Sequence, residues 1–212
     1  MAQYFELHPH NPQRRLIKQA VTILNSGGVI AYPTDSSYAL GCHIGDKAAM
    51  ERIRIIRGFT DRHDFTLVCR DLSQLALYAR VDNASYRLIK SLTPGPYTFI
   101  LPATREVPRR LQNPKRKTIG LRVPAHAVVD ALLAELGEPI MSVTLMLPGD
   151  DLPLSDPHEI RAALEHLVDL VIDGGPCSLE PTTVIALDEA GARLRRRGRG
   201  PVPAGVASEV PV

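Results

Sequence analysis

Short apolar runs rich in β-forming residues alternate with amphipathic helical segments along almost the whole chain. The first helical segment, residues 12–26, carries apolar side chains at helical spacing and ends at Gly27-Gly28. The apolar run at residues 29–32 follows, and the polar stretch 33–37 breaks it. This alternation favours a single-domain α/β fold, in which helices pack against one twisted mixed sheet.

The remaining elements are predicted from the same two signals, apolar side chains at helical spacing and short apolar runs of β-forming residues. Further helices are expected at residues 46–57, 72–78, 84–92, 127–136 and 157–166. Further strands are expected at residues 65–69, 97–101, 118–123, 140–144, 170–172, 183–187 and 193–195. Helices and strands therefore interleave along the chain.

The length of the chain limits the number of domains. A chain of 212 residues, 44% of them hydrophobic, can bury one full core, so we predict one domain over residues 1–200. Residues 201–212 are rich in Pro, Val and Ala and are expected to form a poorly ordered tail. The sequence has no long apolar run and a polar start, which predicts a cytoplasmic protein with no membrane partner. The three cysteines lie far apart and are expected to be reduced and structural.

The distribution of charge is more informative than its sum. The formal net charge is only +2, which does not by itself indicate a nucleic-acid partner. Two stretches are basic: the first contains Arg105, Arg109, Arg110, Lys115, Arg116 and Lys117, and the second contains Arg193, Arg195, Arg196, Arg197 and Arg199. Each stretch taken singly is most simply a solvated loop, and an RNA-binding surface requires the two to converge on one face.

The signatures of several common enzyme classes are missing from the sequence. It contains no G-x-S-x-G, no H-E-x-x-H, no G-x-G-x-x-G after a strand and no G-x-x-x-x-G-K-[ST]. The seven histidines show no metal-ligand spacing. The sequence therefore predicts no protein-held metal and assigns no catalytic residue.

Hydroxyl and guanidinium side chains stand near the ends of several predicted strands. Thr34 follows the first strand, Thr182 precedes another, and Arg122 lies in a strand that ends at a proline. Ser142 and Thr144 are two residues apart, so they point to the same face of their strand. A guanidinium fork suits a carboxylate or a phosphate. Together these groups predict an anion-binding site, although a Ser or Thr taken singly is more often chosen for a turn or a strand.

Several strings resemble successive signatures of the YrdC family, and they occur in order over most of the chain. They are YPTDSSYALG at residues 32–41, PGPYTFIL at 94–101, GLRVP at 120–124 and PTTV at 181–184. The stretch FTLVCRDL at residues 65–72 resembles the YciO branch in particular. The resemblance implies a YrdC-like fold with a concave, positively charged cavity on the open face of the sheet.

The resemblance also implies a reaction and a set of site residues. Synthases of the family convert L-threonine, bicarbonate and ATP, which usually carries Mg²⁺, to threonylcarbamoyl-AMP and pyrophosphate for threonylcarbamoyladenosine modification of transfer RNA. Matched residue by residue, the nucleotide would meet Arg57, Thr118, Thr144 and Arg196. The threonine end would meet Thr34, Arg122, Ser142 and Thr182.

The chain departs from the synthases at two positions on the nucleotide side. Their K-x-R pattern corresponds to Arg57-Gly58-Phe59, so one cation is replaced by an aromatic ring. Their S-x-N pattern corresponds to Ser142-Val143-Thr144, which lacks the side-chain amide. Two hypotheses follow: a threonylcarbamoyl-AMP synthase-like enzyme of low activity, or a non-catalytic protein that binds double-stranded RNA, transfer RNA or the ribosome. The RNA-binding residues would be Arg109, Arg110, Lys115, Arg116 and Lys117.

Overall fold

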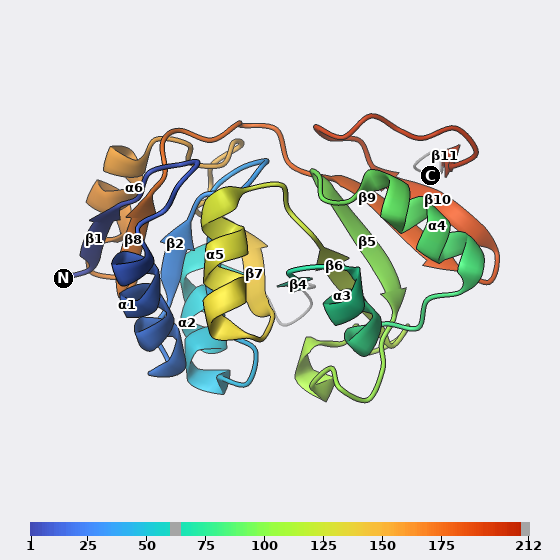
Figure 1. Ribbon diagram of the computed structural model, residues 1–212, viewed down its shortest axis with the longest axis horizontal. Coiled ribbons are helices and arrows are strands. Elements are labelled where there is room, and N and C mark those ends of the chain that lie inside the picture. The colour runs from blue at the N-terminus through green and yellow to red at the C-terminus, as the bar shows by residue number, and fades with distance from the viewer. Residues whose placement is uncertain (60–64, 209–212) are drawn as a thin grey trace.

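One mixed β-sheet runs through the whole molecule in the computed structural model (Figure 1). The structure describes residues 1–59 and 65–208. Within them the strands follow the order β1-β8-β2-β3-β7-β4-β6-β5-β9-β10-β11. Their bounds are β1 Gln3–Glu6, β2 Ile30–Tyr32, β3 Ala39–His43, β4 Thr66–Val68, β5 Tyr97–Pro102, β6 Thr118–Arg122, β7 Ile140–Thr144, β8 Leu170–Asp173, β9 Thr183–Asp188, β10 Gly191–Arg196 and β11 Ala207–Ser208.

The helices pack on both faces of this sheet. Their bounds are α1 Arg14–Asn25, α2 Lys47–Arg57, α3 Leu72–Tyr78, α4 Asn83–Leu92, α5 Ala127–Leu136 and α6 Pro157–Leu164, with a 3₁₀ turn, η1, at Arg109–Leu111. One core cluster joins α1 and α5 to β1, β2 and β8. The other joins α2 and α6 to the opposite face and continues to α3 and α4. No helix among the described residues is both long and apolar enough to cross a membrane.

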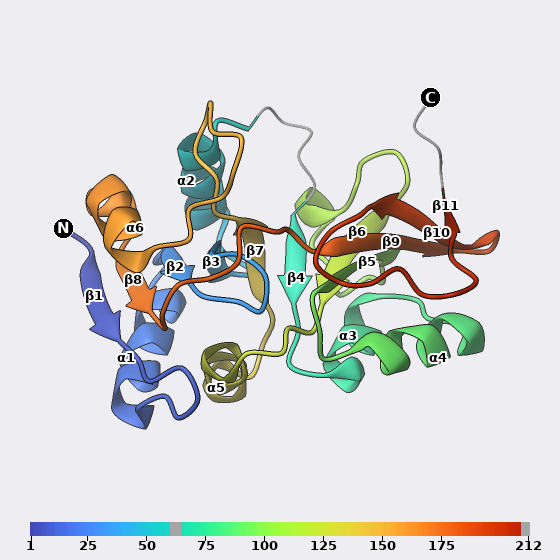
Figure 2. The same cartoon turned by 90° about the horizontal axis from the view of Figure 1, so that it is seen from above.

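The twist of the sheet explains why helices on one face lie on different sides of the molecule. Neighbouring strands rotate by about 20–25° relative to each other. Figure 2 accordingly shows α2 and α6 on one side of the molecule and α3 and α4 on the other, although all four pack on one face of the twisted sheet. Helices α1 and α5 pack on the other face of the sheet and cover only the half that runs from β1 to β7. Farther along the same face, residues of β7, β4, β6, β5 and β9 line a cavity.

The α/β fold predicted from the sequence is confirmed. Every predicted helix and strand is present, with ends shifted by at most two residues. The sequence analysis missed β1, β3 and β11. Strand β1 is an edge strand of four residues in which only Phe5 is buried, so its sequence hardly alternates. Strand β3 follows directly on a polar stretch and contains a glycine, which obscured its β pattern.

Part of the C-terminal segment expected to form a poorly ordered tail, residues 201–212, makes contacts with the sheet. Tyr97 donates a hydrogen bond from its hydroxyl to the carbonyl of Pro201 at 2.9 Å, and Thr183 donates one to the carbonyl of Gly200. Strand β11 pairs in parallel with β10. These backbone contacts hold the segment up to Ser208, and residues 209–212 lie outside the described part of the chain.

Candidate functional site

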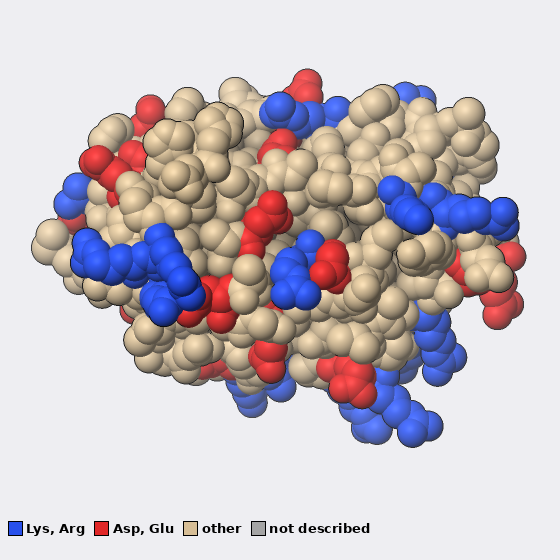
Figure 3. Space-filling model, viewed as in Figure 1, with Lys and Arg blue, Asp and Glu red and all other residues tan. Residues whose placement is uncertain are grey.

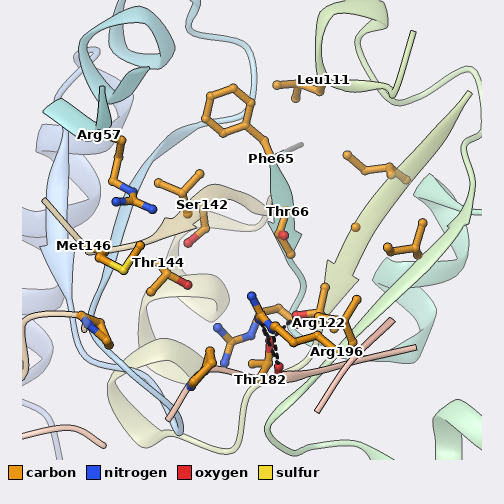
Figure 4. Close-up of a pocket in the computed structure, with 18 of the residues that line it drawn as sticks. Arg57, Phe65, Thr66, Leu111, Arg122, Ser142, Thr144, Met146, Thr182 and Arg196 are labelled. Atoms are coloured by element: carbon orange, nitrogen blue, oxygen red, sulfur yellow. Dashed lines mark hydrogen bonds between the residues drawn. The ribbon is translucent and has the colours of Figure 1, made fainter. Parts of the chain in front are cut away.

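A cavity of about 470 Å³ lies against the sheet (Figure 4). Its floor is formed by residues that stand side by side on four neighbouring strands: Ser142 of β7 is opposite Thr66 of β4, Thr66 is opposite Gly120 of β6, and Gly120 is opposite Ile100 of β5. Since alternate residues of a strand share a face, the register aims these four positions at the cavity.

Arg122 is the most firmly held cation of the cavity. It is only 7% exposed, and its Nη2 lies 2.6 Å from Oδ1 of Asp35 and 3.1 Å from Oγ of Ser36. Asp35 is fixed in turn, because its Oδ2 accepts a hydrogen bond from the backbone N–H of Ala125 at 2.8 Å. The buried Nε of Arg122 has no hydrogen-bond partner among the described residues. The guanidinium is therefore positioned by the protein and still has a donor to offer.

Thr34 lies behind Arg122 and is not among the described residues that line the cavity. It is buried, donates a hydrogen bond from its hydroxyl to the carbonyl of Ser37 at 2.7 Å, and lies 3.5 Å from Nη2 of Arg122. Thr34 therefore contacts Arg122, and the contact with the threonine end that the resemblance implied stays a prediction.

Arg57 is the last residue of α2 and points into the cavity (Figure 4). Asp46 caps the start of this helix by accepting the N–H of Ala49 at 2.8 Å, and Gly58, at φ 61°, ends it. Arg57 is 8% exposed, and its buried Nε has no hydrogen-bond partner among the residues described. Burial lowers the pKa of Arg57, because an unpaired charge is poorly solvated there.

Phe59 supports the guanidinium of Arg57. The Cζ atom of Arg57 lies 4.5 Å from the centre of the Phe59 ring, a distance typical of a cation–π contact. The ring is partly buried against the core and is not among the described cavity-lining residues. The position that the resemblance matched to a second cation therefore holds a ring that packs against Arg57 and, among the described residues, does not line the cavity.

Ser142 and Thr144 both line the cavity, as their spacing predicted. The hydroxyl of Tyr32 donates a hydrogen bond to Oγ of Ser142 at 2.8 Å. Because Oγ of Ser142 acts there as an acceptor, its own proton is left for another partner. Burial raises the pKa of Tyr32 to about 12, so its phenol keeps this proton at neutral pH.

Arg196 and Thr182 meet at the other side of the cavity (Figure 4). Nε and Nη2 of Arg196 donate to the carbonyl of Thr182 at 3.2 and 3.1 Å, and Nη2 lies 3.3 Å from its Oγ1. The same Oγ1 lies 2.8 Å from Oγ1 of Thr98. Burial and the nearby charge of Arg122 lower the pKa of Arg196. An anion between these two arginines would relieve their repulsion.

The structure thus brings together seven of the eight residues matched to nucleotide or threonine. Arg57, Thr118, Arg122, Ser142, Thr144, Thr182 and Arg196 all line the cavity. The sequence analysis missed Thr66 and Thr98, which face it from β4 and β5. It also missed an apolar part of the wall that includes Phe65, Ile100, Leu111, Val184, Leu152 and Leu179. The alternation of Thr66 with the buried Leu67 was a signal for one of them, but only the strand order shows that Thr66 lies beside Ser142.

The basic residues predicted to bind RNA lie outside this cavity. Arg109, Arg110, Lys115, Arg116 and Lys117 are all exposed, in the connection between β5 and β6. Figure 3 shows Lys and Arg side chains projecting at the edge of the molecule where Figure 1 places this connection. The second basic stretch is divided, because Arg193 pairs with Asp188 while Arg196 turns into the cavity.

The described residues do not build a metal site. No three of their His, Cys, Asp or Glu side chains come together, and Asp151 is the one carboxylate among those that line the cavity. Octahedral Mg²⁺ bound by protein alone would need more oxygen ligands than this. The cavity therefore fits an anion better than a free metal ion.

Comparisons with known proteins agree with the fold and the cavity. The family model Sua5_yciO_yrdC, described as "Telomere recombination", matches residues 22–198. "Uncharacterized protein YciO" of Escherichia coli is 58% identical over 202 residues, which cover 95% of this chain and 98% of that protein. Its crystal structure covers the same shares of both chains and has a TM-score of 0.92.

Two more distant relatives carry names that refer to threonine. The threonylcarbamoyl-AMP synthase of Halorhodospira halophila is 33% identical over 181 residues, which cover 85% of this chain and 94% of that protein. The crystal structure of P. abyssi Sua5 complexed with L-threonine is 25% identical, with a TM-score of 0.84 over 92% of this chain and 57% of the other.

A twisted mixed sheet with an arginine-lined cavity defines this molecule as an α/β protein with a basic cavity on its sheet. The chain belongs to the Sua5/YciO/YrdC family, as its ordered motifs predicted. Its similarity to YciO also confirms the predicted branch.

Proposed function

We propose that the cavity binds an adenine nucleotide together with L-threonine, as a threonylcarbamoyl-AMP synthase does. The observation that carries this proposal is the convergence of Arg57, Arg122 and Arg196, two of which have a buried Nε without a partner among the described residues. A buried guanidinium N–H without a hydrogen-bond partner is costly unless an anion satisfies it. A triphosphate and an amino-acid carboxylate are anions of suitable size and charge.

The two ends of the ligand would occupy different parts of the cavity. Arg57, Thr118, Thr144 and Arg196 would meet the nucleotide, and its base would rest on the apolar wall. Arg122, Ser142 and Thr182 would hold the threonine end, with Thr34 keeping Arg122 in place. Arg122 is the stronger candidate for the carboxylate because Asp35 already fixes its orientation.

The reaction would need charge stabilisation on the nucleotide side. Threonine and bicarbonate form a carbamate with loss of water, a carbamate oxygen attacks the α-phosphorus of ATP, and the bond to the β-phosphate breaks as pyrophosphate leaves. Arg57 and Arg196 would stabilise the leaving charge. Mg²⁺ would enter on the triphosphate oxygens, and we assign it no step because the described residues offer it few ligands.

We propose low synthase turnover, because Phe59 supplies no second cation and Thr144 supplies no amide. The test is incubation with threonine, bicarbonate and ATP, followed by detection of threonylcarbamoyl-AMP by mass spectrometry. Thr144→Asn should raise product formation, since it restores an amide at a cavity-lining position. The matched control, Thr118→Asn, places the same amide elsewhere and should not raise it. No product from either the parent or Thr144→Asn would argue against catalysis.

A second function, binding of double-stranded RNA or transfer RNA, is favoured by the exposed cations between β5 and β6. It is compatible with the first, because a synthase of this kind prepares a group for transfer RNA, and it would remain if catalysis were absent. Both roles use cytoplasmic ligands, so the proposal includes a cytoplasmic location. Binding that falls steeply with salt and varies little among RNA sequences would support it.

A further inference from the structure

A second hollow, of about 580 Å³, lies at the outer edge of the sheet. Four cations and two polar side chains line it: Arg80, Arg105, Arg109, Lys117, Thr104 and Gln112. The sequence analysis singled out three of these cations as parts of a basic stretch. It did not include Arg80, which follows α3 and reaches the hollow only through the fold.

The walls of this hollow are held by backbone hydrogen bonds. The N–H of Arg80 donates to the carbonyl of Pro102 at 2.9 Å, and the N–H of Ala103 donates to the carbonyl of Lys117 at 2.9 Å. Thr104 is bound to the end of α3 through its N–H, which donates to the carbonyl of Tyr78 at 3.0 Å. The chain segments that carry Arg80, Arg105 and Lys117 are therefore tied to one another.

Within the described chain, the four cations have no carboxylate partner. No Asp or Glu is among the described residues that line the hollow. None of the ion pairs formed within the described chain involves Arg80, Arg105, Arg109 or Lys117. Four like charges around one depression repel one another, so a bound polyanion would be stabilised there.

The backbone of Lys117 also directs this arrangement. Its φ is 55°, and among the described residues it is the one non-glycine with a positive φ. Its N–H donates to the carbonyl of Asn113 at 2.9 Å, and Oδ1 of Asn113 accepts the N–H groups of Lys115 and Arg116 at 3.1 and 3.0 Å. A left-handed conformation is uncommon for lysine. The connection thus holds Lys117 at the hollow while the next residue, Thr118, lines the cavity.

We propose that this hollow is a binding site for the phosphodiester backbone of RNA, separate from the nucleotide cavity. The inference deepens the RNA-binding role proposed above and rests on it. Nε2 of Gln112 donates to the carbonyl of Val107 at 2.9 Å, which leaves Oε1 as an acceptor for a ribose 2′-hydroxyl. A depression also suits a ridge of phosphates better than a flat membrane surface.

The same segment of the chain, the connection between β5 and β6, separates the hollow from the cavity. Leu111 of η1 lines the cavity, whereas Arg109 and Gln112 on either side of it line the hollow. At the start of β6, Lys117 likewise lines the hollow and the next residue, Thr118, lines the cavity. An RNA held in the hollow would therefore lie next to a cavity that binds a nucleotide, which is the arrangement needed to bring RNA close to the product of that cavity.

The test is fluorescence anisotropy with a labelled RNA duplex at several salt concentrations, using Arg80→Ala/Arg105→Ala. Both side chains are exposed, so the double variant should fold. We expect at least tenfold weaker binding at low salt and a salt slope smaller by about 2, because two phosphate contacts are lost. The matched control is Arg14→Ala/Arg15→Ala at the start of α1, which removes two exposed arginines far from the hollow and should leave the slope unchanged.

The outcomes separate this inference from the nucleotide proposal. Equal weakening in the two double variants, or no RNA binding by the parent at low salt, would overturn the hollow as an RNA site. Anionic phospholipid vesicles bound through Arg80 and Arg105 in place of RNA would overturn it as well. ATP binding, measured by calorimetry on the same variants, should not change. Absence of ATP binding by the parent would instead count against the proposal that the cavity binds a nucleotide.

Discussion

At the scale of single residues, the site is a set of arginines held in different ways. Arg122 is locked by Asp35, Arg196 is anchored on Thr182, and Arg57 rests on the Phe59 ring. The two arginines whose buried Nε lacks a partner among the described residues, Arg57 and Arg122, have the most to gain from a ligand. We therefore expect substitution of each arginine to change ligand binding to a different extent.

Arg196→Ala should weaken ATP binding by about 1.5–3 kcal/mol, the worth of a hydrogen bond to a charged group. Its fold should survive, since the lost contacts go to one neighbouring residue, Thr182. Calorimetric titration of ATP measures the change. Arg197→Ala is the control, because this exposed neighbour does not line the cavity within the described residues. Equal affinities for Arg196→Ala and the parent would remove Arg196 from the site.

The cysteines should react slowly with thiol reagents at pH 8. Burial raises the pKa of Cys177 to about 11 and that of Cys42 to about 12, and it also raises the pKa of Cys69. A raised pKa leaves little reactive thiolate below pH 10, and reactivity should increase only as the pH approaches these values. Reaction with a chromogenic disulfide, followed in native and denaturing buffer, checks this. Fast native reaction of Cys177 at pH 8 would contradict the raised pKa of this partly buried thiol.

At the scale of elements, the site depends on strand register. Ser142, Thr66, Gly120 and Ile100 line the floor because four strands pair in one register. Gly120 keeps the middle of this floor open, since a Cβ there would lie 3.0 Å from Oγ1 of Thr66. A side chain at this position would compete with a ligand for space.

Gly120→Ala should therefore weaken ATP binding, because the added methyl group takes up space in the cavity, and it should lower the free energy of unfolding by about 1–3 kcal/mol through overpacking. Adding Thr66→Ala removes the hydroxyl that the new Cβ approaches, so the double variant should bind ATP better than Gly120→Ala alone. Calorimetry on the three variants gives the coupling between the positions. Additive effects of the two substitutions would show that the contact does not limit the cavity.

Sequence periodicity predicted the helices and strands themselves better than it predicted which strands lie side by side in the sheet. Helix α1 buries Ile17, Ala20, Val21 and Leu24 at the spacing that identified it. Strand β3 was missed because its polar entry and glycine hide the alternation. Spacing alone placed Ser142 and Thr144 on one face. It could not place Thr66 beside Ser142, because these two residues are 76 positions apart in the chain and their strands are joined by no short turn.

At the scale of the whole molecule, sheet twist and helix placement create the cavity. Helices α1 and α5 cover one face of the sheet over its N-terminal half, and the cavity lies farther along the same face. The ordered motifs gave the family and hence seven of the lining residues, whereas the apolar wall and the contribution of Arg80 to the second hollow depend on strand order and loop paths. Such long-range placement has no local sequence pattern.

The central claim is that the cavity binds a nucleotide through its buried cations, and Arg57 tests it most directly. Calorimetric titration of ATP should show binding by the parent and at least tenfold weaker binding by Arg57→Gln, which keeps much of the side-chain volume but removes the charge. Arg57→Lys should recover part of the affinity because it restores the charge without the fork. Absence of ATP binding by the parent, or equal affinity in Arg57→Gln, would contradict the account.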